Sequence, residues 1–366
     1  MRIAYVNANY QKNHTGGGHV HVEQFIKNAK EQGHDVWVYP GNQYQGVKTI
    51  PTDRLNHIKT LRKMDALYVR LENAAPKMLS WSVPPRRRLY GFPLVAWEFN
   101  TLPDELDSEH PGEAGLKGLF ERYSPGCDLG VCVSPKLAEI VANKLEIKRV
   151  ITISNGSDPD LFTPDAPIAP RMIPFQDKFN VVWVGSIKET WHDLGLIAEA
   201  ARLLWVDEEG RNINFHIIGA GLSGFMAEMP PNMFYWGAER YQRLPNWLAG
   251  MQVGLSLYKP GKSHYNSPLK LFDYLSSALP VVSTEHPVAG DILKALGTED
   301  LMIPFGDPKT LARVLMGLAS DRERCERIGA AGKQLIIDKY NWHQSVKDTL
   351  GAMEEILKEK GKVPKA

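Results

Sequence analysis

Three features common in other protein classes are scarce or absent in this sequence of 366 residues. It holds only three cysteines, Cys127, Cys132 and Cys325, an odd number without the spacing of a metal site, which favours a reducing compartment. The formal net charge is +1, so no polycationic character indicates a nucleic-acid partner. No apolar run approaches the length of a membrane span, and residues 1–6 are too short an apolar stretch for a signal peptide. These absences predict a cytoplasmic protein.

The residues that are present are typical of a globular protein, with 43% hydrophobic and 23% charged residues in a chain long enough for two domains. Short apolar runs alternate with helical patterns, which predicts two parallel sheets, each with helices on both faces. A proline-rich stretch at 165–177 is the expected linker. The expected strands are 3–6, 36–39, 66–69, 94–97, 129–133 and 150–153, then 180–184, 214–218, 233–236, 253–257, 281–283 and 301–303.

The stretch from 263 to 284 combines a polar loop, a short helix and a buried strand. Lys270 and Asp273 are three residues apart, so they share one face near the start of that helix. A helix N-terminus beside a lysine suits a phosphate, and a carboxylate one turn deeper suits sugar hydroxyls. Taken alone, the pair is better explained as a surface ion pair.

Polar and glycine-rich segments follow several of the expected strands, at the edge where open α/β sheets bind ligands. Glycines at 16–18 and at 185 allow a backbone to approach a diphosphate closely, although a flexible turn explains them equally well. Glu98 and Asn100 follow the strand at 94–97. Residues 101–105 also fit a helix cap, which accounts for part of that pattern.

Two stretches carry a resemblance to a known family. Ser-Pro-Leu-Lys-Leu-Phe-Asp-Tyr-Leu, followed by Leu-Pro-Val-Val-Ser-Thr (267–284), resembles the donor-binding segment of retaining GT-B glycosyltransferases, the group of glycogen and sucrose synthases. Asn-Gly-Ser-Asp-Pro-Asp-Leu-Phe (155–162) resembles that family's interdomain signature. The family has two glutamates in the donor segment; here Asp273 takes the second position and Tyr265 the first.

The resemblance runs nearly end to end and implies the GT-B architecture, an α/β fold of two Rossmann-like, doubly wound parallel-sheet domains facing a cleft. Residues 1–165 would form the acceptor domain, with a last helix at 342–366 packing back on it. Residues 166–341 would form the nucleotide-sugar donor domain.

Together with the residue patterns, the resemblance predicts the site. The predicted catalytic residues are Lys270, Glu98 and Lys188. The predicted donor-binding residues are Gly16, Gly17, Gly185, Ser186, His192, Gly237, Ala238, Ser267, Leu269, Lys270 and Asp273, and the predicted acceptor residues are Asn100 and His19. Where the family has an arginine and a lysine on the diphosphate, this chain has Ser186, and Lys188 and His192 are alternative substitutes.

The implied activity is retaining transfer of a sugar from a nucleoside-diphosphate sugar to a saccharide or lipid-linked acceptor, in polysaccharide or glycoconjugate synthesis. The donor is expected to be linked to UDP or GDP, with UDP-glucose favoured, and neither a metal nor a further cofactor is expected. A sugar-nucleotide epimerase is an alternative. So is a non-catalytic subunit, because Tyr265 and Ser186 replace a family acid and a family base.

Three further patterns have competing explanations. Asp158-x-Asp160 matches a metal signature of other glycosyltransferases, but the Asn-Gly turn and Pro159 favour a structural turn. The G-x-G-x-x-G at 219–224 matches a dinucleotide motif, but the prolines at 230–231 end its helix too early. Arg86, Arg87 and Arg88 suit either a solvated edge or a peripheral contact with the inner face of a membrane.

Overall fold

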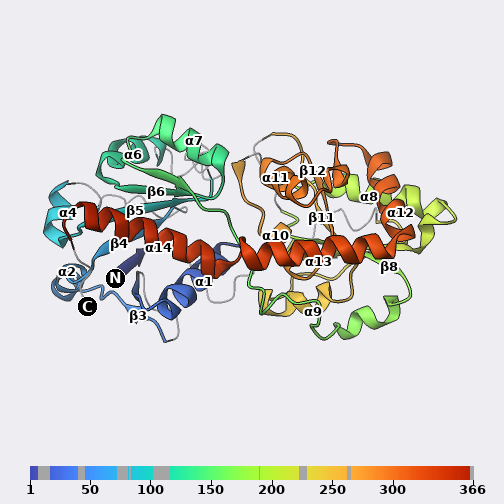
Figure 1. The fold of residues 1–366 in the computed structure, drawn as a ribbon, viewed down its shortest axis with the longest axis horizontal. Helices are drawn as coiled ribbons and strands as arrows, with labels where there is room; N and C mark the ends of the chain where they lie inside the picture. The colour runs from blue at the N-terminus through green and yellow to red at the C-terminus, as the bar shows by residue number, and fades with distance from the viewer. Residues whose placement is uncertain are drawn as a thin grey trace. The chain divides into compact units, whose positions relative to one another are not determined.

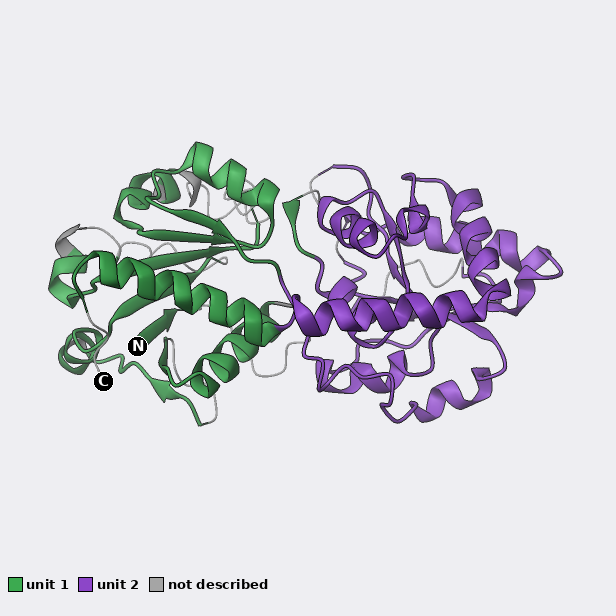
Figure 2. Ribbon diagram, in the orientation of Figure 1, with its two compact units in different colours: residues 1–154, 265–267, 342–366 green, residues 155–264, 268–341 purple. Residues whose placement is uncertain are grey.

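The computed structural model describes residues 1–6, 17–39, 46–71, 81, 84–101, 116–188, 190–221, 229–261 and 265–362. The chain forms two compact units (Figure 2). Unit 1 comprises Met1–Ser154, Tyr265–Ser267 and Trp342–Ala366, and unit 2 comprises Asn155–His264 and Pro268–Asn341.

The boundary between the units differs from the predicted one at 165, because the chain joins unit 2 from Asn155 onward. The backbone amide of Ser157 donates to the Tyr340 carbonyl at 3.0 Å, and Phe162 is fully buried in a core of unit 2. The Asn-Gly turn is therefore bound to the second unit. The last segment belongs to unit 1, where the sequence placed it.

Unit 1 contains a parallel sheet with the strand order β3-β2-β1-β4-β5-β6-β7 in its described residues (Figure 1). The order reverses between β1 and β4, as in doubly wound dinucleotide-binding folds. The strands are β1 (Arg2–Val6), β2 (Asp35–Tyr39), β3 (Lys48–Thr49), β4 (Ala66–Arg70), β5 (Leu94–Phe99), β6 (Leu129–Cys132) and β7 (Val150–Thr152).

Helices cover both faces of this sheet because successive strand residues point to opposite sides. Ile3 and Tyr5 of β1 pack with α1 and α14, whereas Ala4 and Val6 pack in a second cluster with α6 and α7. The helices are α1 (Gly17–Glu31), α2 (Arg54–Leu61), α4 (Pro84–Tyr90), α6 (Leu116–Tyr123), α7 (Pro135–Lys144) and α14 (Trp342–Glu359), with a 3-10 turn η3 (Ser124–Gly126).

Unit 2 contains a second parallel sheet, with the order β10-β9-β8-β11-β12-β13 in the described residues. This is the same winding as in unit 1, with the reversal between β8 and β11. The strands are β8 (Phe179–Val184), β9 (Ile213–Ile218), β10 (Met233–Tyr235), β11 (Val253–Ser256), β12 (Val281–Thr284) and β13 (Met302–Ile303).

Two hydrophobic clusters sandwich this sheet. Val181 and Trp183 of β8 pack with α8 and α12, and Val182 between them packs with α9, α10 and α11. The helices are α8 (Leu194–Val206), α9 (Leu244–Leu248), α10 (Leu269–Ser276), α11 (Pro287–Ala295), α12 (Pro308–Ser320) and α13 (Arg322–Asp338), with 3-10 turns η4 (Pro170–Phe175), η5 (Gly210–Asn212), η7 (Tyr241–Arg243) and η9 (Glu299–Leu301).

Each strand expected from the sequence is present within two residues at either end, so the fold class of two doubly wound parallel sheets is confirmed. The short edge strand β3 was not expected, because Lys48 and Thr49 are exposed and lack an apolar run. Among the described helices, none is both long and apolar enough to cross a membrane.

Candidate functional site

The reversal of strand order in unit 2 lies between the carboxyl ends of β8 and β11, where doubly wound sheets bind ligands. Gly185 follows β8 and Tyr258 lies just beyond β11. Gly219, after β9, approaches so closely that a Cβ there would lie 1.6 Å from the Gly185 carbonyl oxygen. Glycine is therefore required where these two loops cross.

Helix α10 is fixed against this edge by its apolar face. Tyr274 is fully buried, and its hydroxyl oxygen accepts the Val184 amide at 2.8 Å. A Cβ on Gly254 of β11 would lie 2.3 Å from the Tyr274 ring, so glycine makes room for that ring. These contacts place Lys270, the second residue of α10, beside the ends of β8 and β11.

Aromatic rings surround the Lys270 ammonium. Its Nζ lies 4.4 Å from the centroid of Trp183 and 5.7 Å from that of Tyr258, within the range of cation–π attraction. Burial lowers the pKa of Lys270 to about 7, and no charged partner among the described residues opposes that effect. The site therefore holds a cation whose charge is not met by a carboxylate in the described part of the chain.

His192 is the polar neighbour of this lysine. Its Nδ1 lies 3.0 Å from the Ser186 carbonyl oxygen, which only accepts, so Nδ1 carries the proton. Its Nε2 lies 3.3 Å from Lys270 Nζ and accepts from the ammonium. Burial, with the Lys270 charge second, lowers the pKa of His192 to about 3. A neutral imidazole thus holds the lysine, and His192 supplies no cation of its own.

Asp273 lies one turn further along α10 and is buried. Its Oδ1 accepts from the Ser157 hydroxyl at 2.7 Å and from the Tyr241 hydroxyl at 3.0 Å. Burial raises the pKa of Asp273 to about 7, although both hydroxyls act in the opposite direction. One carboxylate oxygen is therefore committed within unit 2.

The other predicted donor residues of unit 2 differ in their exposure. Gly237 adopts φ 78°, in the left-handed region that favours glycine, and its carbonyl accepts the Gly219 amide at 2.8 Å. Ala238, the next residue, is exposed, and so is Lys188. Ser186 is half-buried. Of the two substitutes that the sequence left open, only His192 contacts Lys270 in the described structure.

The predicted residues next to α10 divide between the units. Leu269 begins α10 and is half-buried. Ser267 is buried and belongs to unit 1 together with Tyr265, whose side chain packs in a core cluster of unit 1 and whose carbonyl accepts from the Ser134 hydroxyl. The side chain at the family's first acid position is therefore a core residue here.

Unit 1 has its own polar cluster at the carboxyl ends of β4 and β5. Parallel register sets Arg70 opposite Glu98, and the two side chains form a buried ion pair. Glu98 Oε1 also lies 3.1 Å from His21 Nδ1 and accepts from Asn100 Nδ2 at 3.2 Å. Burial opposes ionisation, but Arg70 and then His21 lower the pKa of Glu98 to about 2. This carboxylate is ionised at neutral pH.

The remaining predicted residues of unit 1 are partly outside this cluster. Asn100 belongs to it through Glu98. His19 is half-buried on α1, and Gly17 begins that helix, whereas Gly16 lies outside the described residues. Asp158, the first acid of the D-x-D pattern, accepts the amides of Asp160 and Leu161 at 3.3 and 3.4 Å, which is the predicted turn.

Sequence reasoning missed several residues that hold the two clusters. Arg70 and His21 bind Glu98, Trp183 stacks under Lys270, and Ser157 and Tyr241 bind Asp273. Only Arg70 left a signal, as a charge at the end of a buried apolar strand. The other contacts depend on segments far apart in the chain.

The comparisons with known proteins bear on the same region. Residues 178–321 match the model of the family described as glycosyl transferases group 1. These residues, which apart from Tyr265–Ser267 lie in unit 2, are similar to group 1 glycosyl transferases. Lys270, His192 and Asp273 all lie within the matched residues, so the predicted resemblance of the donor segment to glycosyltransferases is confirmed.

A relative from Bacillus subtilis, named as the teichuronic acid biosynthesis glycosyltransferase TuaH, is 30% identical over 193 residues. The match covers 49% of this chain and 46% of that relative, so the chain matches less than half of the relative's length.

Solved structures resemble the whole chain. Sucrose-phosphate synthase from Thermosynechococcus elongatus has a TM-score of 0.72 at 13% identity, covering 98% of this chain and 99% of that one. HepE of Anabaena, in complex with UDP-glucose, has a TM-score of 0.69 at 12% identity, covering 96% and 100%. The TM-scores show that the chain has the GT-B fold of these glycosyltransferases, and at such low identity the likeness establishes the fold alone.

Proposed function

We propose that this protein is a glycosyltransferase that takes a sugar from a nucleoside-diphosphate sugar bound to unit 2. The observation that carries the proposal is Lys270, a cation at the start of α10 and at the strand reversal, with no carboxylate partner in the described part of the chain. A ligand with a diphosphate supplies the missing charge. The HepE structure with UDP-glucose supports a UDP-linked donor.

Lys270 and the first turn of α10 would stabilise the leaving diphosphate. Negative charge develops on the diphosphate as the bond to the sugar breaks, and preorganised positive groups stabilise that charge. The free amides at a helix N-terminus add to the lysine charge. We propose that no metal is needed. In this proposal Lys270 and the amides of α10 supply the positive charge that a metal would otherwise bring to the diphosphate.

His192 would act as a positioning residue for Lys270. Its protonated Nδ1 is fixed on the Ser186 carbonyl, so Nε2 faces Lys270 as an acceptor. An acceptor favours the charged form of the lysine without cancelling its charge. In this arrangement Lys270 is the cation that binds phosphate, in place of the family's arginine.

Asp273 would bind the ribose through the oxygen that Ser157 and Tyr241 leave open. Both hydroxyls donate to Oδ1, so Oδ2 can accept a ribose hydroxyl. Because the pKa of Asp273 is raised, its carboxyl group is fully ionised only at alkaline pH. A ribose hydroxyl that donates a hydrogen bond to it would favour the ionised form.

The finer features of the reaction follow the family resemblance. We propose retention at the anomeric carbon and an acceptor that is a saccharide or a lipid-linked saccharide, in polysaccharide or glycoconjugate synthesis. The name of TuaH, which refers to teichuronic acid biosynthesis, supports a role in polysaccharide synthesis. The ionised Glu98 would hold Asn100 in place for the acceptor, because its carboxylate accepts from the Asn100 side chain and, with a pKa of about 2, cannot donate a proton at neutral pH.

The test is a panel of nucleoside-diphosphate sugars, scored for thermal stabilisation and for release of the nucleotide, with and without EDTA. The proposal expects stabilisation by one nucleotide class, release of UDP or GDP that EDTA does not abolish, and retention in the product. Isomerised sugar nucleotide without release would show an epimerase, and binding without turnover in the presence of varied acceptors would show a non-catalytic subunit. Activity lost in EDTA and restored by manganese would overturn the metal-free mechanism.

A further inference from the structure

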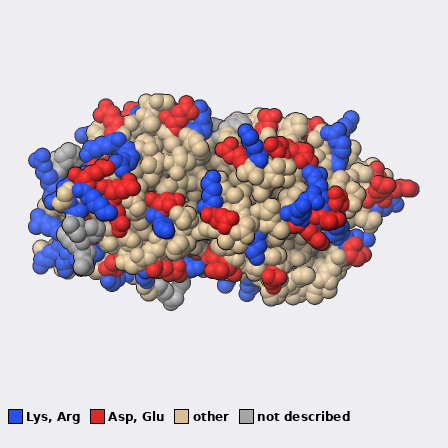
Figure 3. All heavy atoms as spheres, in the orientation of Figure 1, with Lys and Arg blue, Asp and Glu red and all other residues tan. Residues whose placement is uncertain are grey.

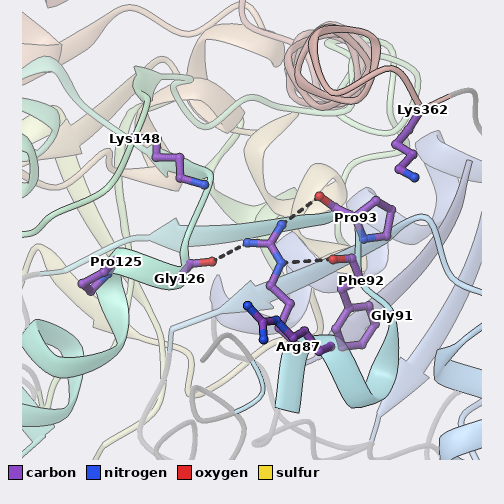
Figure 4. A pocket seen from close by; sticks show the side chains of 9 residues that line it. Arg87, Gly91, Phe92, Pro93, Pro125, Gly126, Lys148 and Lys362 are labelled. Carbon is purple, nitrogen blue, oxygen red and sulfur yellow. Dashed lines mark hydrogen bonds between the residues drawn. The ribbon is translucent and has the colours of Figure 1, made fainter. Parts of the chain in front are cut away.

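An open pocket of about 470 Å³ lies on unit 1 (Figure 4). Its lining comes from Gly91–Pro93 before β5, from Pro125 and Gly126 before β6, and from Lys148 before β7. The pocket therefore lies at the amino ends of these strands, whereas Glu98 and Arg70 lie at the carboxyl ends. It is a separate place from the edge where this sheet is expected to bind a substrate.

The side chains around the pocket are strongly basic. Arg87, Arg88, Lys148 and Lys362 line it, and its lining contains no aspartate or glutamate. On the face drawn in Figure 3, Lys and Arg side chains also gather at the end of unit 1 where α4 lies. The excess is local, because the net charge of the whole chain is only +1.

One buried carboxylate anchors the pocket without neutralising it. Asp128 is 1% exposed, and it lies 2.5 Å from Arg87, 2.8 Å from Lys148 and 2.7 Å from Lys360. Burial opposes its ionisation, but the hydrogen bonds from these cations lower the pKa of Asp128 to about 2. The one negative charge of Asp128 is thus surrounded by the three positive charges of Arg87, Lys148 and Lys360, which leaves a net charge of about +2. Arg88 and Lys362 add two further positive charges to the pocket.

The central cation is held rigidly. Arg87 donates to the carbonyls of Phe92 at 3.0 Å, Gly126 at 2.9 Å and Pro93 at 2.8 Å, as Figure 4 shows. Arg87 is therefore held by the fold, whereas the sequence grouped it with Arg86 and Arg88 as either a solvated edge or a membrane contact. Arg88 is exposed, as is Lys362, and no ion pair joins either one to another residue that the structure describes.

We propose that this pocket binds a phosphate-bearing anion. Rigid guanidinium and flexible ammonium groups are the side chains that recognise phosphate, and the pocket volume is within the usual range for ligand sites. The phosphate could belong to the headgroup of an anionic lipid or to a small soluble anion. In either case the ligand is distinct from the sugar donor, which the proposed function assigns to unit 2.

The experiment compares two double variants of the full chain. Arg88→Gln/Lys362→Gln removes the two exposed pocket cations and leaves Asp128 with all its partners. Lys59→Gln/Lys136→Gln removes two exposed charges from α2 and α7, outside the pocket. Thermal unfolding of both variants establishes that they are folded.

Two probes separate the sources of the phosphate. Vesicles of phosphatidylcholine with phosphatidylglycerol are compared with pure phosphatidylcholine by co-sedimentation, and inorganic pyrophosphate is titrated by calorimetry. We expect the pocket variant to lose about 25-fold in affinity for the probe that binds, at about fivefold for each basic residue, and the control variant to lose less than threefold.

Each outcome decides the proposal. Binding of anionic vesicles alone identifies a lipid headgroup, and binding of pyrophosphate identifies a soluble anion. Equal losses in the two variants would show general electrostatics and overturn the site, as would the absence of binding to both probes. Neither result depends on sugar transfer, so the proposed function stands or falls separately.

Discussion

The two units share one winding and place charged residues at the same edge of their sheets, but they treat those charges differently. In unit 1 the Glu98 carboxylate is buried against Arg70, His21 and Asn100. In unit 2 the Lys270 ammonium has aromatic rings and a neutral imidazole around it. Glu98 is therefore satisfied by the protein, while Lys270 is left for an anionic ligand.

The pKa values express the same contrast. Partners keep Glu98 ionised, with a pKa of about 2, in spite of burial. Burial without a charged partner among the described residues lowers the pKa of Lys270 to about 7. The same strand order can therefore produce two kinds of site. Where a residue at a neighbouring strand end carries the opposite charge, as Arg70 does for Glu98, a closed ion pair forms. Where the described residues provide none, as for Lys270, the cation stays open to a ligand.

The largest expected effect is on the stability of unit 1. Glu98→Gln leaves Arg70 buried without its counter-charge, so we expect a loss of about 3–5 kcal/mol in the free energy of unfolding. Urea denaturation measures it. The double variant Arg70→Met/Glu98→Leu replaces both charges with apolar groups and should recover most of that loss. A loss below about 1 kcal/mol in Glu98→Gln would show that the pair is not a closed cluster.

The second prediction concerns turnover in unit 2. Lys270→Ala removes the cation that meets the diphosphate, and we expect turnover to fall by about 10²–10³-fold, the effect of losing one preorganised donor. Lys188→Ala tests the competing residue on the exposed loop and should cost less than about tenfold. Lys294→Ala, on the exposed side of α11, is the matched control. Equal effects of Lys188→Ala and Lys270→Ala would remove the distinction between the two lysines.

The fold was predictable because its signals are local. Buried parallel strands are short continuous apolar runs, and each one expected is present. Lys270 and Asp273 were also found locally, from their spacing at the start of one helix. The match to group 1 glycosyl transferases covers the same helix.

The partners of the site residues were not predictable, because they come from distant parts of the chain. Arg70 meets Glu98 only through the register of β4 and β5. His192 and Lys270 are 78 residues apart in the sequence, and His192 lies in a loop without a periodic pattern. Asp128 forms ion pairs with cations from α4, from the turn before β7 and from the end of α14. A single sequence does not indicate which distant residues will be in contact.

A third prediction sharpens the contrast by changing only the neutral neighbour of Lys270. His192→Leu removes the acceptor at Nε2, and we expect about a tenfold loss in kcat/KM for the donor, within the range for a hydrogen bond to a charged group. His192→Gln keeps an acceptor oxygen in a similar place and should restore most of the activity.

The pH profile separates this positioning role from a structural one. Without the acceptor, the charged form of Lys270 is less favoured, so its pKa should fall and the alkaline limb of the profile should move to lower pH. An unmoved limb in His192→Leu, with equal losses in His192→Gln, would indicate packing alone.

The smallest expected effect is on the pH dependence of donor binding, with UDP-glucose as the probe because its diphosphate carries no group that titrates near neutral pH. The free Lys270 has a pKa of about 7, lowered by burial, and the protonated form binds the diphosphate. A bound diphosphate raises that pKa, so affinity is full well below pH 7 and falls as the pH rises through 7. Between pH 6.5 and 7.5 the expected fall is about threefold, the fraction that one such group loses by deprotonation.

Calorimetry at pH 7 in two buffers of different ionisation enthalpy should show uptake of about half a proton on binding, as a half-protonated group requires. Lys270→Arg is the matched variant, because arginine stays charged throughout this range. Its affinity should be independent of pH over the same interval, with no proton uptake. A wild-type affinity that is equally flat would mean that Lys270 is already fully charged in the free protein. The contrast between a satisfied Glu98 and an open Lys270 would then rest on geometry alone.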